Sequence, residues 1–409
     1  MNRRVVITGM AGLTSLGHDW DTIRGNVLAG RSGIRYMEDW ARYDGLNTNL
    51  GAPIEDFSVP GHYTRKRVRS MGRVSLFSTT TAERALEQAG LLGDPVVSSG
   101  DTGIAYGSSS GTPDAMAEFG AMLHEYSTRT ITATSYIRMM SHTAVVNTGL
   151  FFNIRGRLIS TCTACTSGSQ AVGYAYESIK QGKQKVMVAG GGEELSATQA
   201  AVFDVLFATS VRNDEPQLTP RPFDKDRDGL VIGEGAATFV LEDLEHAQQR
   251  GATIIAEIIG FATNCDAMHV TQPTAETMEV AMRLGLDDAG IDAGAVGYVS
   301  AHGTATDLGD VAESQATNAV FGSNMPFSSM KSYFGHTLGA CGAQEVWLTI
   351  ESMNRDEFWP TLNLDNLDSR CGQLDYIVGE PRKISTEHVV SNSFAFGGIN
   401  TSLVIQRWS

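Results

Sequence analysis

The sequence predicts a layered α/β fold, because short buried strands alternate with helical patterns along the chain. The first strand signals are rich in Val, Ile and Leu, end in Gly or other small residues, and lie at 3–10, 101–107, 156–161, 185–191 and 235–242. A second series of strands is expected around 254–259, 296–301 and 326–329, and in 388–405, where two strands are joined by a Gly-rich loop. Helical patterns between several of these strands make alternating layers of helix and sheet the natural architecture.

The chain has 409 residues, 42% of them hydrophobic, which is enough to bury a large core. We place a boundary near Gly251, between an N-terminal half (1–250) and a C-terminal half (251–409). No low-complexity linker lies at this boundary, so we expect the halves to pack together rather than to be tethered.

Composition excludes several classes of protein. No apolar run approaches the ~18 residues that a bilayer requires, and the start "MNRRVVITGM" leads into a strand pattern rather than a signal peptide. Five cysteines do not predict a disulfide framework and suit a reducing compartment. We therefore expect a cytoplasmic protein without a membrane partner, and the formal charge of −15 argues against nucleic-acid binding.

The stretch "ISTCTACTSGSQAVGYAYESIKQGK" (159–183) contains the pair Cys162 and Cys165, and predicts a strand that leads into a helix. The apolar face of that helix is formed by Val172, Ala175, Tyr176 and Ile179. Gly182 stands where the helix should stop. Cys165 then lies at the helix N-terminus, where free N–H groups and the helix dipole are expected to lower the pKa of a thiol.

Four interpretations of the CxxC pair are possible: half of a zinc site, a dithiol redox pair, two inert core thiols, or one catalytic thiol with a neighbour. Zinc needs about four ligands, and Cys265, Cys341 and Cys371 are isolated in sequence, so we expect no metal. Nothing else in the chain suggests a small dithiol fold. The choice between core thiols and a nucleophile depends on the rest of the chain.

Two histidines follow predicted strands in the C-terminal half. His302 ends the apolar strand of "VGYVSAHGTATDLGD" (296–310), a position where α/β sheets usually bind ligands. In "PFSSMKSYFGHTLGACGAQEVWLTI" (326–350), Lys331 and His336 precede a helix whose apolar face is Ala343, Val346, Trp347 and Ile350. A thiol, two histidines and a lysine suit nucleophilic chemistry on a carbonyl group. "SFAFGGIN" (393–400) adds a loop whose glycines permit close approach of a ligand, or else a plain hairpin turn.

Taken together, "TACTSGS", "RPFDKDRDGLVIGEGAA", "HGTATDLGDVAE", "KSYFGHTLGACG" and "NSFAFGGIN" resemble the successive signatures of elongating β-ketoacyl-[acyl-carrier-protein] synthases of the two-histidine class. The resemblance runs from "RRVVITGM" to the carboxyl end. It implies a thiolase-like fold, a five-layered αβαβα sandwich of two similar halves, usually as a homodimer; a heterodimer with a related subunit is also possible. It further implies a decarboxylative Claisen condensation with no cofactor bound by the enzyme, since phosphopantetheine arrives on the acyl carrier protein.

The resemblance also implies roles for single residues. Cys165 would be the nucleophile, with the N–H groups of Cys165 and Phe396 as the oxyanion hole. His302 and His336 would stabilise the enolate of malonyl-carrier protein, and Lys331, paired with Glu313, would polarise the site. The substrate-binding positions that it implies are Ser110, Thr304, Thr306, Phe394 and Gly397.

Some positions depart from the family pattern. Ala305 stands where Gly is common, and Ala395 and Ile399 replace a Gly and a Thr, which bears on loop mobility more than on the reaction. Phe396 matches the family's gating phenylalanine. Ser110 occupies the place of a bulky Ile or a Gly in relatives, which suggests an enlarged or more polar acyl pocket.

Two other motifs are discounted and one is retained. "DKDRDG" (224–229) begins like a calcium loop, but its twelfth position is Gly235, so we expect a structural turn. "AGGGEE" (189–194) lacks nucleotide-binding spacing. The basic segment Arg65, Lys66, Arg67 and Arg69 is either a solvated helix face or, as the resemblance implies, the docking site of an acidic carrier protein.

Alternatives to an active ketosynthase are a non-catalytic partner subunit that sets chain length and a thiolase that uses free coenzyme A. Cys165 argues against the first, because those subunits lack the nucleophile. Thiolases normally carry a second catalytic Cys near the carboxyl end, where this chain has Phe396. Segments such as "YDGLNTNLGAP" (43–53) resemble ketosynthases of dedicated clusters, of the aryl polyene type, more than housekeeping fatty-acid enzymes.

Overall fold

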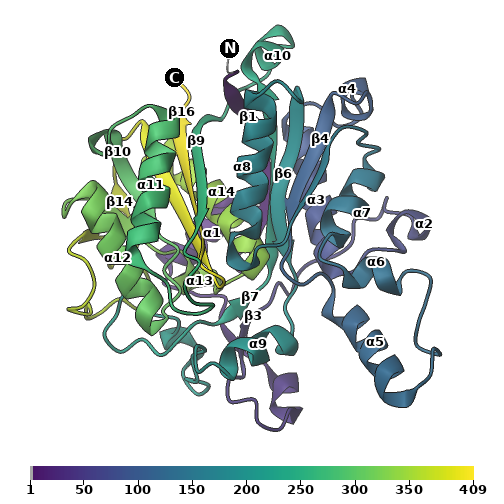
Figure 1. The fold of residues 1–409 in the computed structure, drawn as a ribbon, viewed down its shortest axis with the longest axis horizontal. Helices are drawn as coiled ribbons and strands as arrows, with labels where there is room; N and C mark the ends of the chain where they lie inside the picture. The colour runs from purple at the N-terminus through teal and green to yellow at the C-terminus, as the bar shows by residue number, and fades with distance from the viewer. Residues whose placement is uncertain (1–2) are drawn as a thin grey trace.

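The computed structural model describes residues 3–409 and contains one large mixed sheet (Figure 1). Its strands are β1 (Val5–Leu13), β4 (Thr102–Gly107), β5 (Leu158–Thr161), β6 (Val186–Glu193), β8 (Gly235–Asp243), β9 (Ala256–Cys265), β10 (Val296–Ser300), β11 (Pro326–Ser328), β13 (Asp375–Tyr376), β15 (His388–Ala395) and β16 (Ile399–Arg407). They are ordered β13-β11-β10-β15-β16-β9-β1-β8-β6-β4-β5. Every strand predicted from the sequence is present, with its ends within a few residues of the expected ones.

The two halves of the chain occupy opposite ends of this sheet and meet where β1 pairs antiparallel with β9, with Val5 opposite Ile258. Hydrogen bonding therefore continues from one half into the other, which agrees with the expected close packing. The boundary near Gly251 stays a prediction; it lies between β8 and β9, just after a short helix.

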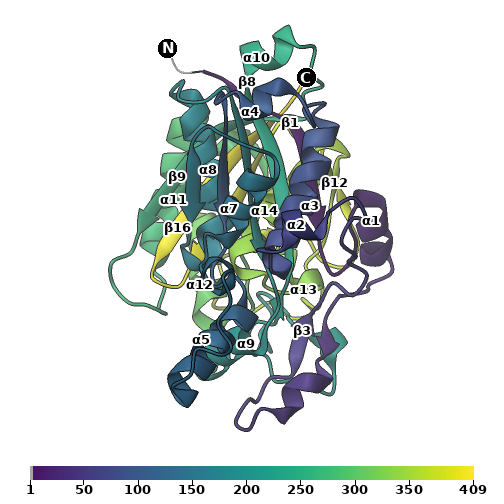
Figure 2. The same cartoon turned by 90° about the vertical axis from the view of Figure 1, so that its right-hand side faces the viewer.

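Helices form three layers around the sheet. The central helices α8 (Ser167–Lys180) and α14 (Cys341–Asn354) pack on each other and on strands of both halves. On the outside, α3 (Arg73–Gln88) and α7 (Thr143–Phe151) cover the N-terminal half, as Figure 2 shows from that side. On the opposite face, α11 (Ala275–Ala289) lies on β9 and β16, with α12 (Asp307–Phe321) beside it. The result is the predicted αβαβα arrangement.

The remaining elements are short and lie around these layers. The helices are α1 (Trp20–Leu28), α2 (Arg65–Val68), α4 (Pro95–Ser98), α5 (Pro113–Glu125), α6 (Ser135–Met139), α9 (Ala197–Asp204), α10 (Leu244–Gln249), α13 (Lys331–Phe334) and the 3₁₀ turns η1 (Glu38–Arg42), η2 (Ala164–Thr166), η3 (Pro216–Leu218), η4 (Ala293–Ala295) and η5 (Leu338–Ala340). The strands are β2 (Arg35–Tyr36), β3 (Leu50–Ala52), β7 (Ile232–Gly233), β12 (Glu357–Phe358) and β14 (Arg382–Lys383). Within residues 3–409, no helix has the length and apolar character that a bilayer crossing needs.

The central helices begin in a tightly packed region of small residues, which positions the site. The predicted apolar face of α8 is buried, and the helix ends at Lys180, two residues before Gly182 with φ +71°. A Cβ atom on Gly191, in β6, would lie 2.5 Å from the carbonyl oxygen of Gly339 in η5. Glycine at this point allows η5, and the start of α14 behind it, to approach β6 closely.

Candidate active site

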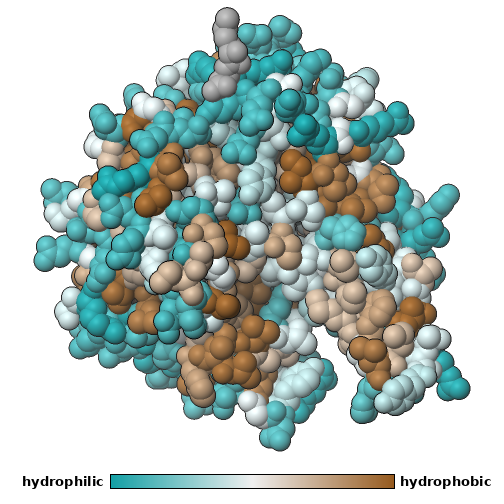
Figure 3. All heavy atoms as spheres, viewed as in Figure 1, coloured by the Kyte–Doolittle hydropathy of each residue, from teal (hydrophilic) through white to brown (hydrophobic). Residues whose placement is uncertain are grey.

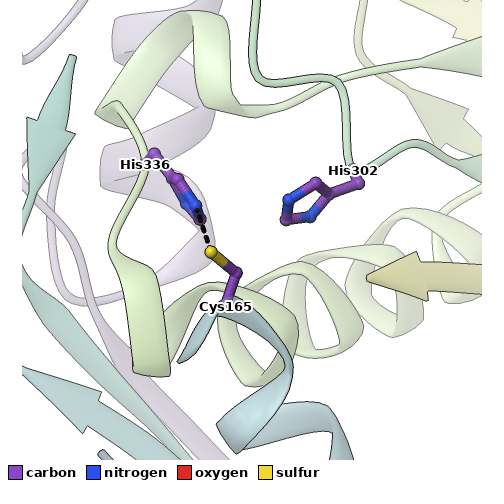
Figure 4. Close-up of side chains that lie close together, drawn as sticks. All are labelled: Cys165, His302 and His336. Carbon is purple, nitrogen blue, oxygen red and sulfur yellow. Dashed lines mark hydrogen bonds between the residues drawn. The ribbon is translucent and has the colours of Figure 1, made fainter. Parts of the chain in front are cut away.

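Cys165, His302 and His336 meet in a buried pocket at the start of the central helices (Figure 4). Cys165 lies in η2, directly before α8; His302 follows β10; and His336 lies between α13 and η5. The Cys165 Sγ is 3.0 Å from His336 Nε2, and the two imidazole rings are perpendicular, with centroids 5.2 Å apart. The structure thus brings together the three residues that the sequence suggested.

The backbone N–H groups of Phe396 and of Cys165 itself lie near enough to the Cys165 sulfur to favour its thiolate form. These are the two groups expected to form the oxyanion hole. Burial nevertheless raises the pKa of the thiol to about 11, although the Lys331 ammonium and the two N–H groups act in the opposite direction. The expectation that the helix start gives Cys165 a lowered pKa is therefore wrong. Burial raises the pKa by more than the helix start lowers it, so the resting site holds a thiol.

His302 is oriented by Lys331, whose Nζ lies 3.2 Å from His302 Nδ1. Burial, and then the charge of Lys331, hold the pKa of His302 well below its usual range, so the ring is neutral. Because a lysine ammonium group can donate hydrogen bonds but cannot accept them, His302 Nδ1 is the acceptor and His302 Nε2 carries the ring proton. Lys331 thereby makes His302 a hydrogen-bond donor on its Nε2 side.

His336 is also neutral, because burial and then Lys331 hold its pKa well below the usual range. Its Nε2 faces the Cys165 sulfur, while its buried Nδ1 has no hydrogen-bond partner within residues 3–409. A buried N–H without a partner is rarer in proteins than an unused acceptor, which favours the tautomer with the proton on Nε2. Two neutral imidazoles therefore offer N–H groups beside one thiol.

Lys331 is paired with Glu345, not with Glu313 as predicted. The Lys331–Glu345 ion pair is fully buried. Burial alone would lower the pKa of Lys331, but Cys341 and Glu345 raise it above its usual value, so the side chain stays cationic. Burial raises the pKa of Glu345 to about 7, against the opposing effect of Lys331.

Glu313 has a different role: its carboxyl group accepts hydrogen bonds from the backbone N–H groups of His302 at 2.6 Å and Gly303 at 2.7 Å. This carboxyl is buried on α12 and clamps the loop that carries His302. Glu313 ends the motif "HGTATDLGDVAE" on which the family resemblance depends, although Glu345 is nearer to Lys331 in the sequence. The signal for Glu345 was present as one acidic residue inside the apolar run of α14, where a charge needs a buried partner.

A cavity of about 430 Å³ leads to the three catalytic candidates. Of the predicted substrate-binding residues, Thr304, Thr306 and Phe394 line it, and Phe396 lies on its wall. Gly397 does not line it; this residue has φ +89° and donates its N–H to the Val270 carbonyl. The Gly-rich loop is therefore a true part of the pocket, with Gly397 serving the conformation of the loop.

Ser110 lies outside this cavity, in a polar cluster behind the nucleophile. Its hydroxyl donates to the buried carboxylate of Glu193 at 3.1 Å and accepts a hydrogen bond from Gln199 Nε2 at 2.7 Å. Glu193 also accepts the N–H groups of Ser109 and Gly339. The position at which relatives carry Ile or Gly is thus occupied by a hydrogen-bonded polar group, and no sequence pattern indicated that Glu193 would accept these hydrogen bonds.

The basic segment is only partly available for a partner. Arg65, Lys66 and Arg69 are exposed around α2. The guanidinium of Arg67 lies 3.6 Å from the centre of the Phe151 ring and donates to the Phe151 carbonyl, so this residue anchors α2 to α7. Three of the four predicted charges remain free to meet another molecule.

Two sets of residues have ligand atoms close enough to hold a metal ion: Cys165, His302 and His336, and His302, Cys341 and Glu345. His302 belongs to both, and its Nδ1 faces the Lys331 ammonium. A second cation beside that buried charge would be repelled, so the arrangement favours an organic substrate. In "DKDRDG", Asp224 accepts the N–H groups of Asp226, Asp365 and Asn366, which confirms a structural turn.

Two family profiles cover most of the chain. The profile described as "Beta-ketoacyl synthase, N-terminal domain" matches residues 2–247, and "Beta-ketoacyl synthase, C-terminal domain" matches 255–365. Among curated relatives, 3-oxoacyl-[acyl-carrier-protein] synthase 2 of Coxiella burnetii is 37% identical, and that of Synechocystis is 33% identical, each over 99% of this chain and at least 98% of the relative.

Solved structures agree with this assignment. A β-ketoacyl synthase from Burkholderia phymatum is 58% identical, with a TM-score of 0.98 over the whole of both chains. A type II PKS ketosynthase solved in complex with its acyl-carrier protein is 28% identical, with a TM-score of 0.88, again over the whole of both chains. This chain therefore belongs to the β-ketoacyl synthase family, and it is an acyltransferase with the thiolase-like fold of the elongating ketosynthases.

Proposed function

We propose that Cys165 accepts an acyl group from an acyl carrier protein and passes it to a carbon nucleophile made from malonyl-carrier protein. The observation that carries this proposal is the meeting of one buried thiol with two neutral imidazoles, of which His336 lies 3.0 Å from the sulfur, beside backbone N–H groups that favour the thiolate. Such donors stabilise the oxyanions and enolates of acyl transfer and condensation.

In the first step, the Cys165 sulfur gives up its proton and attacks the thioester carbonyl of the acyl carrier. The carbon–sulfur bond to the carrier breaks, and the departing carrier sulfur takes up that proton and leaves as a thiol. The oxyanion of the tetrahedral intermediate accepts hydrogen bonds from the N–H groups of Cys165 and Phe396, the groups that favour the thiolate in the resting site. Lys331 lowers the pKa of Cys165 against the effect of burial. It therefore favours the thiolate at the moment of attack.

In the second step, malonyl-carrier protein loses carbon dioxide, and the electron pair of the broken bond becomes an enolate. The enolate oxygen accepts hydrogen bonds from His302 and His336. Its carbon then attacks the Cys165 thioester and the C–S bond breaks, so that the Cys165 sulfur leaves as a thiolate, which takes up a proton from solvent to restore the thiol. The histidines suit this role because their low pKa values leave both rings neutral. A neutral imidazole N–H can donate a hydrogen bond to the enolate, but it is too weak an acid to protonate the carbanion permanently.

A condensation assay tests this function. Purified protein, an acyl-carrier thioester and malonyl-carrier protein should yield a 3-oxoacyl carrier and carbon dioxide. His302→Ala and His336→Ala should lose decarboxylation while Cys165 is still acylated. Reaction with acetyl-coenzyme A in place of malonyl-carrier protein would instead indicate a thiolase, and no acylation with any carrier thioester would indicate a non-catalytic partner subunit.

We further propose that the carrier protein contacts the exposed charges Arg65, Lys66 and Arg69. Acyl carrier proteins are acidic, and most of this protein's surface repels them, as its net charge is −15. Charge reversal at Arg65 and Lys66 should raise KM for carrier-bound substrate but not for a small thioester. Lys183→Glu, also exposed and remote in sequence, is the matched control; an equal effect of the control would count against docking.

For assembly and pathway we propose a cytoplasmic homodimer that elongates polyene-type chains in a dedicated cluster. One structural neighbour is a ketosynthase in complex with its chain length factor from Xenorhabdus doucetiae, 26% identical over 99% of this chain, which makes a heterodimer the alternative assembly. Native mass spectrometry distinguishes the two assemblies, and a panel of saturated and polyunsaturated acyl carriers tests the pathway.

A further inference from the structure

Exposed apolar side chains surround the entrance to the catalytic cavity. Leu206 and Phe207 follow α9, Val270 lies between β9 and α11, and Leu308 stands in the first turn of α12. All four line the cavity and are also open to solvent. Figure 3 shows hydrophobic surface gathered over the part of the molecule where Figure 1 labels α9. We call these four residues the apolar collar.

Phe207 is the most unusual member of the collar. Its backbone has φ +54°, the left-handed region that favours glycine, and its N–H bonds to the Asp204 carbonyl at 2.9 Å as α9 ends. Glycine is the usual residue at such a helix end. The side chain is 91% exposed, so the ring gains almost no burial in this chain in return for the strained backbone. The phenyl ring therefore contributes little to the stability of the isolated chain, whereas a bound partner could bury it.

The position of the collar limits what that partner can be. A carrier-bound thioester reaches Cys165 through this cavity, so the body of the carrier must lie at the entrance while its arm is inside. The collar side chains carry no charge, and the two aspartates that line the cavity are engaged, Asp307 by Arg370 and Arg227 and Asp228 by Arg212. Contact at the entrance can then be apolar, in a protein whose overall charge opposes an acidic partner.

We propose that the apolar collar, with Phe207 at its centre, binds an apolar surface of the carrier protein around the attachment point of its arm. This inference rests on the proposed function, because it takes the carrier as the substrate donor. It adds a contact of a second kind: the basic segment at α2 attracts the carrier through charge, and the collar holds it by burial of apolar area at the entrance.

The test measures binding of a carrier protein that lacks its phosphopantetheine arm, so that neither catalysis nor the arm contributes. Phe207→Gly should keep the fold, and its melting temperature should be equal to or above that of the parent, because glycine suits φ +54°. We expect its affinity for the armless carrier to fall at least fivefold, and the loss to persist at high salt. The loss caused by Arg65→Glu should shrink as salt rises. Leu123→Ala, an exposed apolar residue of α5 outside the collar, is the control and should bind as the parent does.

Equal affinities of the parent and Phe207→Gly, or no binding of the armless carrier by either, would overturn the inference. A changed oligomeric state of Phe207→Gly with unchanged carrier affinity would also overturn it, and would assign the collar to contact with a second copy of the chain. Acylation of the parent at Cys165 by a small acyl-pantetheine thioester tests the proposed function separately. Success there with failure of the binding test would reject only the collar.

Discussion

Substitution of Glu313 tests how His302, for which we propose a catalytic role, is held in place. The Glu313 carboxyl accepts two buried N–H groups, at 2.6 Å from His302 and 2.7 Å from Gly303. Glu313→Gln keeps the shape but offers only one acceptor oxygen, so one N–H loses its partner. Glu313→Ala leaves both N–H groups without a partner and opens a cavity as well.

The expected magnitude follows from the cost of a buried N–H without a partner, which is about 1–3 kcal/mol. Glu313→Gln should therefore weaken the loop by about 1–3 kcal/mol, and Glu313→Ala by about twice as much or more. Since about 1.4 kcal/mol corresponds to a factor of ten, amide exchange in a peptide covering 300–306 should speed up by roughly ten- to a hundredfold in the Gln variant. Decarboxylation of malonyl-carrier protein should fall with it, because His302 is no longer fixed.

Hydrogen-exchange mass spectrometry makes this measurement locally, and exchange in α8 serves as the internal reference. Unchanged exchange at 300–306 in both variants would refute the clamp. Faster exchange with full decarboxylation activity would refute the link between the clamp and the chemistry. Glu345→Gln is the matched comparison, because it should disturb Lys331 without releasing the loop.

Three further outcomes are expected. Because burial raises the pKa of Cys165 to about 11, alkylation of this thiol by iodoacetamide should increase about tenfold per pH unit above pH 7, and Lys331→Met should move the plateau to still higher pH; a plateau near pH 8 would contradict this. Gly191→Ala forces a Cβ to 2.5 Å from the Gly339 carbonyl and should destabilise the fold by about 1–3 kcal/mol, which thermal unfolding measures and an unchanged melting temperature would refute. Ser110→Ile should change the acyl-length preference in a competition among acyl carriers, and an identical product distribution would reject a role for this position.

Much of the fold could be predicted from local patterns. Strand periodicity and closing glycines located the strands of the central sheet, and the buried face of α8 was visible in Val172, Ala175, Tyr176 and Ile179. The meeting of Cys165 with His302 and His336 was also predictable, because the resemblance to a family supplies distant contacts that periodicity alone cannot.

What the sequence could not provide depended on tertiary packing. The pairing of Lys331 with Glu345 follows from how α14 lies against α13; the acidic residue in the apolar run of α14 indicated a buried partner but not which one. The raised pKa of Cys165 reflects burial by segments from both halves of the chain. The local sequence around Cys165 indicated only the start of a helix. The left-handed backbone of Phe207 was equally hidden, since the residue type predicts the opposite.

The central claim is that Cys165 is the acyl-accepting nucleophile and that its neighbour Cys162 is not. Intact-mass spectrometry after incubation with an acyl-carrier thioester tests it directly, in the parent, Cys165→Ala and Cys162→Ala. We expect one acyl group on the parent and on Cys162→Ala, and none on Cys165→Ala. Acylation that persists in Cys165→Ala, or that disappears only in Cys162→Ala, would contradict it.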